Sequence, residues 1–482
     1  MKPSYFKQSF YILALATLIF IGLKPYLPAR IFPEGISSTH IVVDSLMLEA
    51  LAGKDIDQVL DHKSQDSLPP SKGQPSSEEE LSKKDPLTPF FDKLQHLEHT
   101  GEGHIRIGYF GDSMTDGDFI VQDLRALFQT NFKGNGIGFL PITSESAASR
   151  GSVRHTYSNN WKRESYVNVK RPTRPFGVAG QVFFVKGTPA WVEYQASQQV
   201  HISQMYTPTL FYGKSGNHEA YVEIRYPGDT TRVIKPLPTD KLLNTLTLAE
   251  GEVKGVRINF FKADSIPIYG VNSSGLEGVY VDNFSSRGNS GLPLSLFNTA
   301  LMQDFDTALG TYDLIVLHFG ANVLNYGSLD YSWYEKGMTK VVEQLRTCFP
   351  KASFLIISTA DKSSKYGMEM RTDTAVEPLS LAQQDYATNV HAGFINLYEL
   401  MGGKGSMLQW VKANPSLAGK DYTHFNARGT KKVAQLLYRE LMKRYLGYKN
   451  PKATPEELEQ QIETSKDTLL HRNTIMNFYN ND

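Results

Sequence analysis

GDSMTDGD, residues Gly111–Asp118, follows the strand-like run Ile105–Phe110 and precedes the amphipathic stretch Phe119–Phe128. This strand–turn–helix context makes Ser113 a candidate nucleophile. A serine hydroxyl is weakly nucleophilic at neutral pH, so it needs exposure at a sharp turn and a base that removes its proton. A helix N-terminus at the turn would favour developing negative charge. The alternative is that Ser113 or Thr115 simply caps a helix.

Two later segments carry the partners that Ser113 needs. In LIVLHFGAN, the apolar run Leu314–Leu317 leads to Asn322, whose amide is able to donate to an oxyanion. In DYTHFNARG, Asp421 and His424 lie three residues apart on one loop. His424 would take the serine proton through one ring nitrogen while Asp421 accepts from the other. An isolated Asp and His would indicate a surface turn, but the three segments together favour a catalytic triad.

Strand-like runs alternate with amphipathic helices over most of the second half of the chain. Apolar runs separated by helices predict an α/β fold with a doubly wound parallel sheet that is covered on both faces. Sites in such sheets form beyond the carboxyl ends of the strands, which is where the candidate residues stand. The expected strands are Ile105–Phe110, one near Val279, Leu314–Phe319, Phe354–Ser358 and Gly393–Leu397.

Residues 139–275 break this alternation. They are rich in Tyr, Phe, Val, Thr and Gly, and they contain short alternating runs such as QVFFVKG and AYVEIRYPG. This pattern predicts an inserted all-β sandwich. The α/β domain is therefore expected to be discontinuous, with residues 86–138 before the insert and residues 276–447 after it.

The ordered segments resemble the SGNH or GDSL-type hydrolases, which are named for serine, glycine, asparagine and histidine in four blocks. Ser113 matches the first block, Asn322 the third, and Asp421 with His424 the last. The resemblance covers roughly residues 86–445 apart from the insert. It implies a flavodoxin-like sheet and catalysis by Ser113, His424 and Asp421 through an acyl-serine intermediate.

The resemblance also assigns an oxyanion hole. Gly288, in VDNFSSRGNSG, fits the second block, where the family uses a backbone N–H as a donor. Because several glycines lie close together there, Gly291 is the alternative. The resemblance implies that the backbone N–H groups of Ser113 and Gly288 and the side chain of Asn322 hold the oxyanion.

One branch of the family, the peptidoglycan O-acetylesterases, is similar to this chain beyond the four blocks. The likeness is carried by the stretch from PFFDKLQHLEHTGEGHIRIGYF into the serine motif, by NGIGFL, and by MGGKGSMLQW at Met401–Trp410. It implies an O-acetylated cell-wall glycan as substrate, most specifically peptidoglycan, and a carbohydrate-binding-module-like insert. The alternatives are a polysaccharide O-acetyltransferase, an esterase acting on another glycan, and an inactive glycan-binding protein.

Aromatic residues in the insert have two possible uses. Trp161, Trp191, Tyr206 and Tyr212 would stack on sugar rings if exposed, but aromatic side chains in strands more often fill the core. None of them is assigned to binding.

Composition argues against several other classes of function. The chain has 482 residues, 40% of them hydrophobic, which is enough to fill apolar cores. Its formal net charge is zero, so no excess of positive charge indicates nucleic acid as a partner. Its single cysteine, Cys348, excludes an internal disulfide and any cysteine-rich metal site, and its spacing predicts a buried position. No HExxH motif is present, so neither a metal nor another cofactor is expected.

The N-terminus differs in character from the rest of the chain. Lys2 and Lys7 precede the apolar run Phe10–Leu23, and no small-residue cleavage site follows it. Residues 1–30 therefore predict an uncleaved signal anchor rather than a cleaved signal, with a buried core helix as the third interpretation. The flanking lysines place the N-terminal end in the cytoplasm and the remainder in the periplasm or outside the cell, tethered to the inner membrane.

Two further segments flank the predicted hydrolase domain. Residues 31–85 contain a stretch rich in Ser, Pro, Lys and Glu, which predicts a low-complexity linker that lets an anchored enzyme reach its substrate. Residues 448–482 predict a helical tail that opens with a capping box formed by Thr454 and Glu457. No obligate protein partner is indicated.

Overall fold

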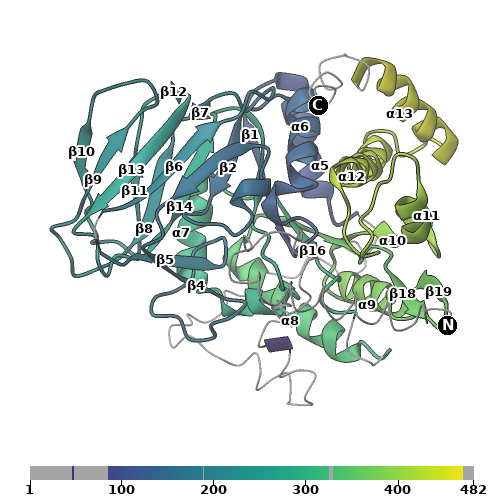
Figure 1. Cartoon of the computed structure of the whole chain (residues 1–482). Coiled ribbons are helices and arrows are strands. Elements are labelled where there is room, and N and C mark those ends of the chain that lie inside the picture. Colours follow the sequence, from purple (N-terminus) through teal and green to yellow (C-terminus); the bar gives the residue numbers. More distant parts are fainter. Residues whose placement is uncertain (1–45, 48–84, 188, 325–328, 470–482) are drawn as a thin grey trace, which may run out of the picture. The chain divides into compact units, whose positions relative to one another are not determined.

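Five parallel strands form the central sheet of the computed structural model, in the order β15-β1-β16-β17-β20. Strands β1 and β16 of this sheet are labelled in Figure 1. Ile107 of β1 lies opposite Val281 of β15 on one side and Leu314 of β16 on the other. Counted along the chain within this sheet, the order is 2-1-3-4-5, as in flavodoxin-like folds. The predicted fold class is confirmed. The strands are β1 (His104–Gly111), β15 (Gly278–Asn283), β16 (Leu314–His318), β17 (Ser353–Ile357) and β20 (Gly393–Ile395).

The structure describes residues 46–47, 85–187, 189–324 and 329–469, all of which lie in the unit Val42–Asp482. Within these ranges, no helix is long and apolar enough to cross a bilayer. The predicted anchor, residues 1–30, and nearly all of the predicted linker lie outside the described residues.

Helices cover both faces of the central sheet because side chains of each strand point alternately to either side. Ile107 and Tyr109 belong to one apolar core with α5, α6 and α12, whereas Phe110 belongs to another with α7, α8 and α9. The helices of the first face are α5 (Thr88–Thr100), α6 (Val121–Phe132) and α12 (Ala427–Lys449). Those of the second are α7 (Thr299–Leu309), α8 (Ser332–Cys348) and α9 (Val376–Asn389).

The predicted β insert is two antiparallel sheets with an apolar core between them. Val192 and Ile258 enter this core from one sheet, and Phe183 and Ile268 enter it from the other. The first sheet is β10 (Val233–Pro236), β9 (Tyr221–Arg225), β13 (Gly255–Phe261), β6 (Ala190–Ala196) and β3 (Val153–Tyr157). The second is β11 (Leu243–Thr247), β8 (Thr209–Gly213), β14 (Ile268–Ser274), β5 (Gln181–Val185) and β4 (Trp161–Ser165), with β2 (Gly136–Leu140) paired to β14.

Side chains of the second insert sheet also pack against the α/β domain. The ring of Phe211 in β8 stacks on Phe305 of α7, with centroids 5.6 Å apart, and Phe139 of β2 contacts both rings edge-on. The insert and the α/β domain thus share one apolar core. Because interiors are close-packed, this contact holds the insert in a fixed position against the α/β domain.

The remaining elements are short, or lie toward the C-terminus. The capping box is confirmed: Glu457 accepts from the Thr454 N–H at 2.8 Å, and the Thr454 hydroxyl accepts from the Glu457 N–H at 3.2 Å. It opens α13 (Pro455–Leu469), the described part of the predicted tail beyond α12. The other elements are β7 (Met205–Tyr206), β12 (Glu252–Val253), β18 (Ser363–Tyr366), β19 (Glu369–Thr372), α10 (Leu397–Met401), α11 (Ser406–Lys412) and the 3-10 helices η3 (Asp116–Asp118), η4 (Ala147–Ser149) and η5 (Leu292–Leu296).

A buried ion pair between Arg106 of β1 and Asp282 of the edge strand β15 joins the central sheet to the insert. The Asp282 carboxylate accepts from Arg106 at 2.6 and 3.0 Å, from the Tyr312 hydroxyl at 2.7 Å and from the Phe139 N–H at 2.8 Å. Burial alone would lower the pKa of Arg106, but Asp282 beside it raises that pKa, so the guanidinium remains charged. This pair ties together β1, β15, β2 and the loop before β16.

The substitution Asp282→Asn is expected to lower the free energy of unfolding by about 3–5 kcal/mol, since it leaves the buried Arg106 charge without its partner. Thermal and urea unfolding measure the change. The matched control is Glu219→Gln, which breaks the exposed pair between Glu219 and Lys262, 3.0 Å apart, and is expected to leave the midpoints unchanged. Equal midpoints for the two variants would contradict this assignment.

Candidate active site

Ser113 lies in the turn that directly follows β1. The Asp112 carbonyl accepts from the Thr115 and Asp116 N–H groups at 3.3 and 3.0 Å, and η3 follows. Neither η3 nor α6 has a side-chain cap, so the alternative in which Ser113 or Thr115 caps a helix is wrong. The expected helix at Phe119 is also corrected: α6 begins only at Val121, so its N-terminus is not at Ser113.

The structure brings Ser113, His424 and Asp421 together in one hydrogen-bonded chain. Ser113 Oγ lies 3.0 Å from His424 Nε2, and His424 Nδ1 lies 2.7 Å from Asp421 Oδ2. With Nδ1–H donating to the carboxylate, Nε2 is left to accept the serine proton. These contacts have the order and lengths that a nucleophile, base and orienting carboxylate require. The catalytic roles of the three residues remain predictions.

The spacing of three residues between Asp421 and His424 has a local structural reason. Asp421 Oδ1 accepts from the backbone N–H groups of Thr423 and His424, each at 3.1 Å, and this closes a side-chain turn. The His424 carbonyl in turn accepts from the Gly419 N–H at 2.8 Å. The same carboxylate therefore shapes the loop with one oxygen and orients the imidazole with the other.

Electrostatics keep Asp421 ionised. Burial opposes its charge, but hydrogen bonds from the His424 side chain and from backbone N–H groups outweigh burial and lower the pKa of Asp421. The pair is nevertheless open to solvent, because the side chains of His424 and Asp421 are 46% and 38% exposed. Water is thus able to reach the base.

The segment MGGKGSMLQW packs against the loop that carries His424. Its helix α11 is fixed by Asp361, which accepts from the Met407 N–H at 2.7 Å. Trp410 of α11 packs against Phe425, next to His424, with ring centroids 5.3 Å apart. Trp410 also accepts from the Leu417 N–H through its carbonyl, at 2.9 Å. This segment therefore supports the loop that carries His424.

The predicted oxyanion residues stand on the loops after β15 and β16, the two strands that flank β1. Gly288 is buried and has φ +80°, a left-handed conformation that favours glycine. Asn322 donates through its side-chain amide to the Asn289 carbonyl at 3.2 Å, so the two loops are in contact. Donation from Ser113, Gly288 and Asn322 to an oxyanion remains a prediction.

Gly291, the alternative to Gly288, has a structural partner. Its N–H donates to Asn289 Oδ1 at 2.9 Å at the start of η5. Because that donor is occupied within its own loop, the structure favours Gly288 over Gly291.

Asp112 is a residue of the site that the sequence interpretation did not single out. It is buried, its carboxylate accepts from the Met114 N–H at 2.9 Å, and it lies close to the backbone N–H groups of Gly320 and Ala321. It therefore ties the turn of Ser113 to the loop that carries Asn322. Burial raises the pKa of Asp112 to about 6, although these hydrogen bonds and nearby His424 act in the opposite direction. Its place next to the serine was the only sequence signal.

Cys348 is buried at the end of α8, as predicted, and burial raises the pKa of its thiol to about 12. Across the described ranges of the chain, no three His, Cys, Asp or Glu side chains gather as metal ligands would. The expectation that the site needs neither a metal nor another cofactor remains a prediction.

Comparison with solved structures finds a protein of similar fold. A peptidoglycan O-acetylesterase matches with a TM-score of 0.61 and 23% identity over 74% of this chain and 96% of its own. Two other matches are the acetyl xylan esterase AlAXEase (TM-score 0.26, 19% identity, 34% of this chain and 81% of its own) and a family two carbohydrate esterase from Cellvibrio japonicus (0.26, 10%, 61% and 99%). The first likeness supports the fold, and the other two have TM-scores too low to support a conclusion. Protein-family models and curated protein sequences give no match.

The raised pKa of Asp112 predicts a specific dependence of stability on pH. The folded carboxyl keeps its proton up to about pH 6, whereas the unfolded one loses it near its ordinary value of 3.8. The folded state therefore binds more protons in this window, and the stability that Asp112 contributes is lost as the pH rises through about 6. The test quantity is the difference in free energy of unfolding between the wild type and Asp112→Asn. This difference is expected to fall by about 3 kcal/mol from pH 4 to pH 7.

Urea unfolding of both proteins across that range measures this difference, in which titrating groups that do not interact with Asp112 cancel. A difference that stays flat or rises with pH would show that Asp112 is ionised in the folded protein throughout.

Proposed function

We propose that the protein is a serine esterase that removes O-acetyl groups from a cell-envelope polysaccharide, with peptidoglycan as the expected substrate. The observation that carries this proposal is the hydrogen-bonded chain from Ser113 Oγ through His424 to Asp421, with contacts of 3.0 and 2.7 Å. It stands at the carboxyl end of β1, beside β16, where the strand order reverses and flavodoxin-like sheets bind their ligands.

Acyl transfer would proceed in two steps. Ser113 Oγ attacks the acetyl carbonyl while its proton passes to His424 Nε2, and the resulting imidazolium is stabilised by Asp421. His424 then gives the proton to the departing sugar oxygen, which leaves an acetyl-serine ester. In the second step His424 removes a proton from water, which attacks the ester. His424 then returns this proton to the departing Ser113 Oγ, which releases acetic acid and regenerates the serine hydroxyl.

The oxyanion of each step would be held by the backbone N–H groups of Ser113 and Gly288 and by the Asn322 side chain. Loss of one such donor typically lowers turnover on the order of 100-fold or more. Asp112 supports this arrangement, because it fixes the turn of Ser113 to the loop of Asn322.

Two arguments support an acetylated envelope glycan as the substrate. The chain shares its fold with a peptidoglycan O-acetylesterase along 96% of that protein. Its N-terminal sequence also predicts an anchor followed by a long polar linker, which would hold the enzyme outside the cytoplasm within reach of the cell wall. Fold alone does not determine the substrate, which is why the choice of glycan rests on the assay below.

Solvent access favours hydrolysis over transfer to another sugar. An acetyltransferase with the same residues must keep water away from the acyl-enzyme, but nearly half of the His424 side chain is exposed. An inactive binding protein is disfavoured because the residues of the triad lie within hydrogen-bonding distance of one another.

The full-length protein is expected to release acetate from O-acetylated peptidoglycan and not from O-acetylated xylan. Ser113→Ala should lower the rate of acetate release roughly 10⁴-fold or more. Asp421→Asn should lower it on the order of 10³- to 10⁴-fold, since the His424 imidazole then takes the wrong tautomer. Enzymatic determination of acetate measures both rates.

Unchanged thermal unfolding of the two variants is the control for folding. Release of acetate from xylan alone would be consistent with the triad but would show that the substrate is not peptidoglycan. Transfer of acetyl between sugars faster than its release would identify a transferase, and no acetyl turnover on either glycan would contradict the proposal.

A further inference from the structure

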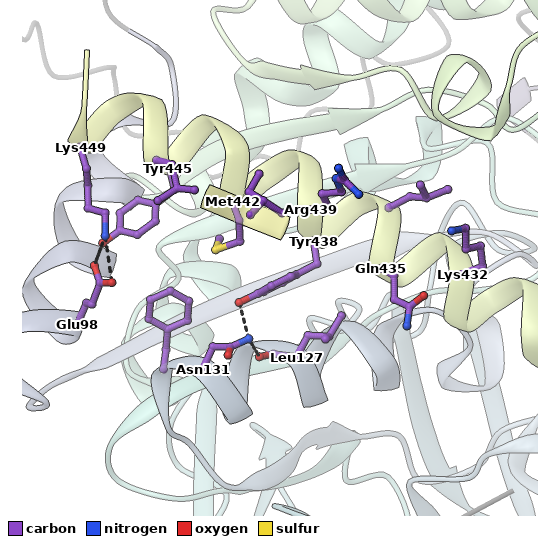
Figure 2. Close-up of a pocket in the computed structure, with 14 residues that line it drawn as sticks. Glu98, Leu127, Asn131, Lys432, Gln435, Tyr438, Arg439, Met442, Tyr445 and Lys449 are labelled. Carbon is purple, nitrogen blue, oxygen red and sulfur yellow. Dashed lines mark hydrogen bonds and ion pairs between the residues drawn. The ribbon is translucent and has the colours of Figure 1, made fainter. Parts of the chain in front are cut away.

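An apolar groove lies between helices α5, α6, α12 and α13 (Figure 2). Leu127, Tyr438 and Met442 line it, and the Tyr438 hydroxyl accepts from the Asn131 side chain at 2.7 Å. None of its lining residues belongs to the catalytic loops, and nothing in the described chain indicates what would cover it. It carries no proposal.

The proposed oxyanion hole combines donors from two loops that are far apart in the chain. The Ser113 N–H belongs to the turn after β1, and the Gly288 N–H belongs to the loop after β15. Each donor has to lie about 2.7–3.1 Å from the same oxyanion, so the two loops have to be placed accurately relative to each other. Contacts between these loops therefore bear directly on catalysis.

The backbone links the two loops close to the donors. The Ser286 N–H donates to the Gly111 carbonyl at 3.1 Å, and Ser113 and Gly288 each follow two residues later in their segments. Beyond this bond, side chains connect the two loops.

Asn283, the last residue of β15, makes the central link. Its side-chain amide donates to the Thr115 carbonyl at 2.8 Å and to Asp118 Oδ1 at 3.3 Å, and its Oδ1 accepts from the Ser285 N–H at 3.0 Å. Two acceptors on one side and a donor on the other fix the orientation of the amide. Asn283 is only 9% exposed, so these bonds are largely shielded from water.

Thr115 transmits this contact to the nucleophile. Its N–H donates to the Asp112 carbonyl at 3.3 Å and so closes the turn that presents Ser113. Its carbonyl is held by Asn283, and its hydroxyl lies 2.7 Å from Ser285 Oγ. Both ends of the turn are therefore fixed, one next to β1 and the other to the loop after β15.

Asp118 is held firmly as the second acceptor. Arg125 donates to its two oxygens at 2.8 and 3.0 Å, and Ser152, just before β3 of the insert, donates to it at 2.5 Å. Burial opposes the charge of Asp118, but Arg125 and Arg150 outweigh burial and lower its pKa. The carboxylate is thus an ionised acceptor in a fixed place beside Asn283.

We propose that Asn283 is a positioning residue that sets the separation of the Ser113 and Gly288 donors in the oxyanion hole. Both of its amide hydrogens are used within the protein, so it would act through Thr115 and Ser285 rather than by direct contact with the oxyanion. The inference rests on the proposed function, because acyl transfer is the reaction that generates this oxyanion.

The test measures hydrolysis of p-nitrophenyl acetate by the full-length protein, which needs no glycan. Asn283→Ala is expected to lower kcat about 10- to 100-fold, up to the loss typical of one oxyanion donor, while KM changes less than about threefold. This loss of turnover without a matching change in KM is what a purely structural role would not produce.

Inhibition by trifluoroacetone reports on the oxyanion hole itself. Ser113 Oγ adds to its carbonyl carbon, the serine proton passes to His424, and the carbonyl oxygen becomes an oxyanion in the hole. Asn283→Ala should bind this ketone more weakly by about the factor that it loses in kcat. The fraction of Ser113 that a fluorophosphonate labels at saturation should equal that of the wild type.

The matched control is Asn244→Ala in β11. Asn244 is 8% exposed, donates to the Lys241 carbonyl at 2.9 Å and accepts from the Lys241 N–H at 3.2 Å, so its removal breaks an equivalent pair of bonds. This variant should keep the kcat and the trifluoroacetone affinity of the wild type, even where its melting temperature falls as far as that of Asn283→Ala.

Three results with Asn283→Ala would overturn the inference: wild-type kcat, a lower kcat with unchanged trifluoroacetone affinity, or a loss explained by unlabelled Ser113. Should this variant not fold, Ser285→Ala replaces it, because it removes the bond between Ser285 and Thr115. It should lower kcat and trifluoroacetone affinity in parallel, about threefold or more, and unchanged values would overturn the inference equally. A wild type that neither hydrolyses the ester nor is labelled at Ser113 would instead contradict the proposed function.

Discussion

The parallel pairing of β1 with both β15 and β16 is the constraint on which the site depends. It sends three chain segments toward the same edge of the sheet: the turn of Ser113, the loop of Gly288 and the loop of Asn322. Hydrogen bonds then fix these loops to one another, above all through the buried Asp112 carboxylate. His424 comes to Ser113 from the far end of the chain because α12 packs on the same face of the sheet as α6.

The insert is as much a part of this arrangement as the strands are. Asp282, on the edge strand β15 of the central sheet, accepts from the backbone N–H of Phe139 in β2, and Phe211 of β8 stacks on Phe305 of α7. Two independent contacts, one polar and one apolar, therefore hold the insert against the α/β domain. Residues of β4 and β5 therefore line a recess together with Asp116 and Asp118, which follow Ser113 in the chain.

The sequence predicted the features that depend on residues close together in the chain. Apolar runs marked all five strands to within a few residues, and the motif around Ser113 together with DYTH identified side chains that the structure places in contact. Of the four aromatic residues weighed in the insert, only Tyr212 is buried in the core; Trp161, Trp191 and Tyr206 are half-buried, and Trp161 packs edge-on against Phe260. What failed locally was the start of α6, because the positive φ of Ile120 and the short η3 carry no clear sequence signal.

Other features depend on contacts between distant residues and were not predictable from one sequence. Helix α9 was not expected, since Ser380 and Gln383 interrupt its apolar face, yet both are buried against the sheet. The approach of the Gly320 and Ala321 backbone to Asp112 arises only when β16 lies beside β1.

Covalent labelling tests the central claim, that His424 activates Ser113, most directly. The full-length protein would be treated with a fluorophosphonate, and the modified residue would be located by mass spectrometry of its peptides. The account predicts rapid labelling of Ser113 in the wild type and its near-complete loss in His424→Ala. Labelling of a different serine, or equal labelling of Ser113 in both proteins, would contradict it.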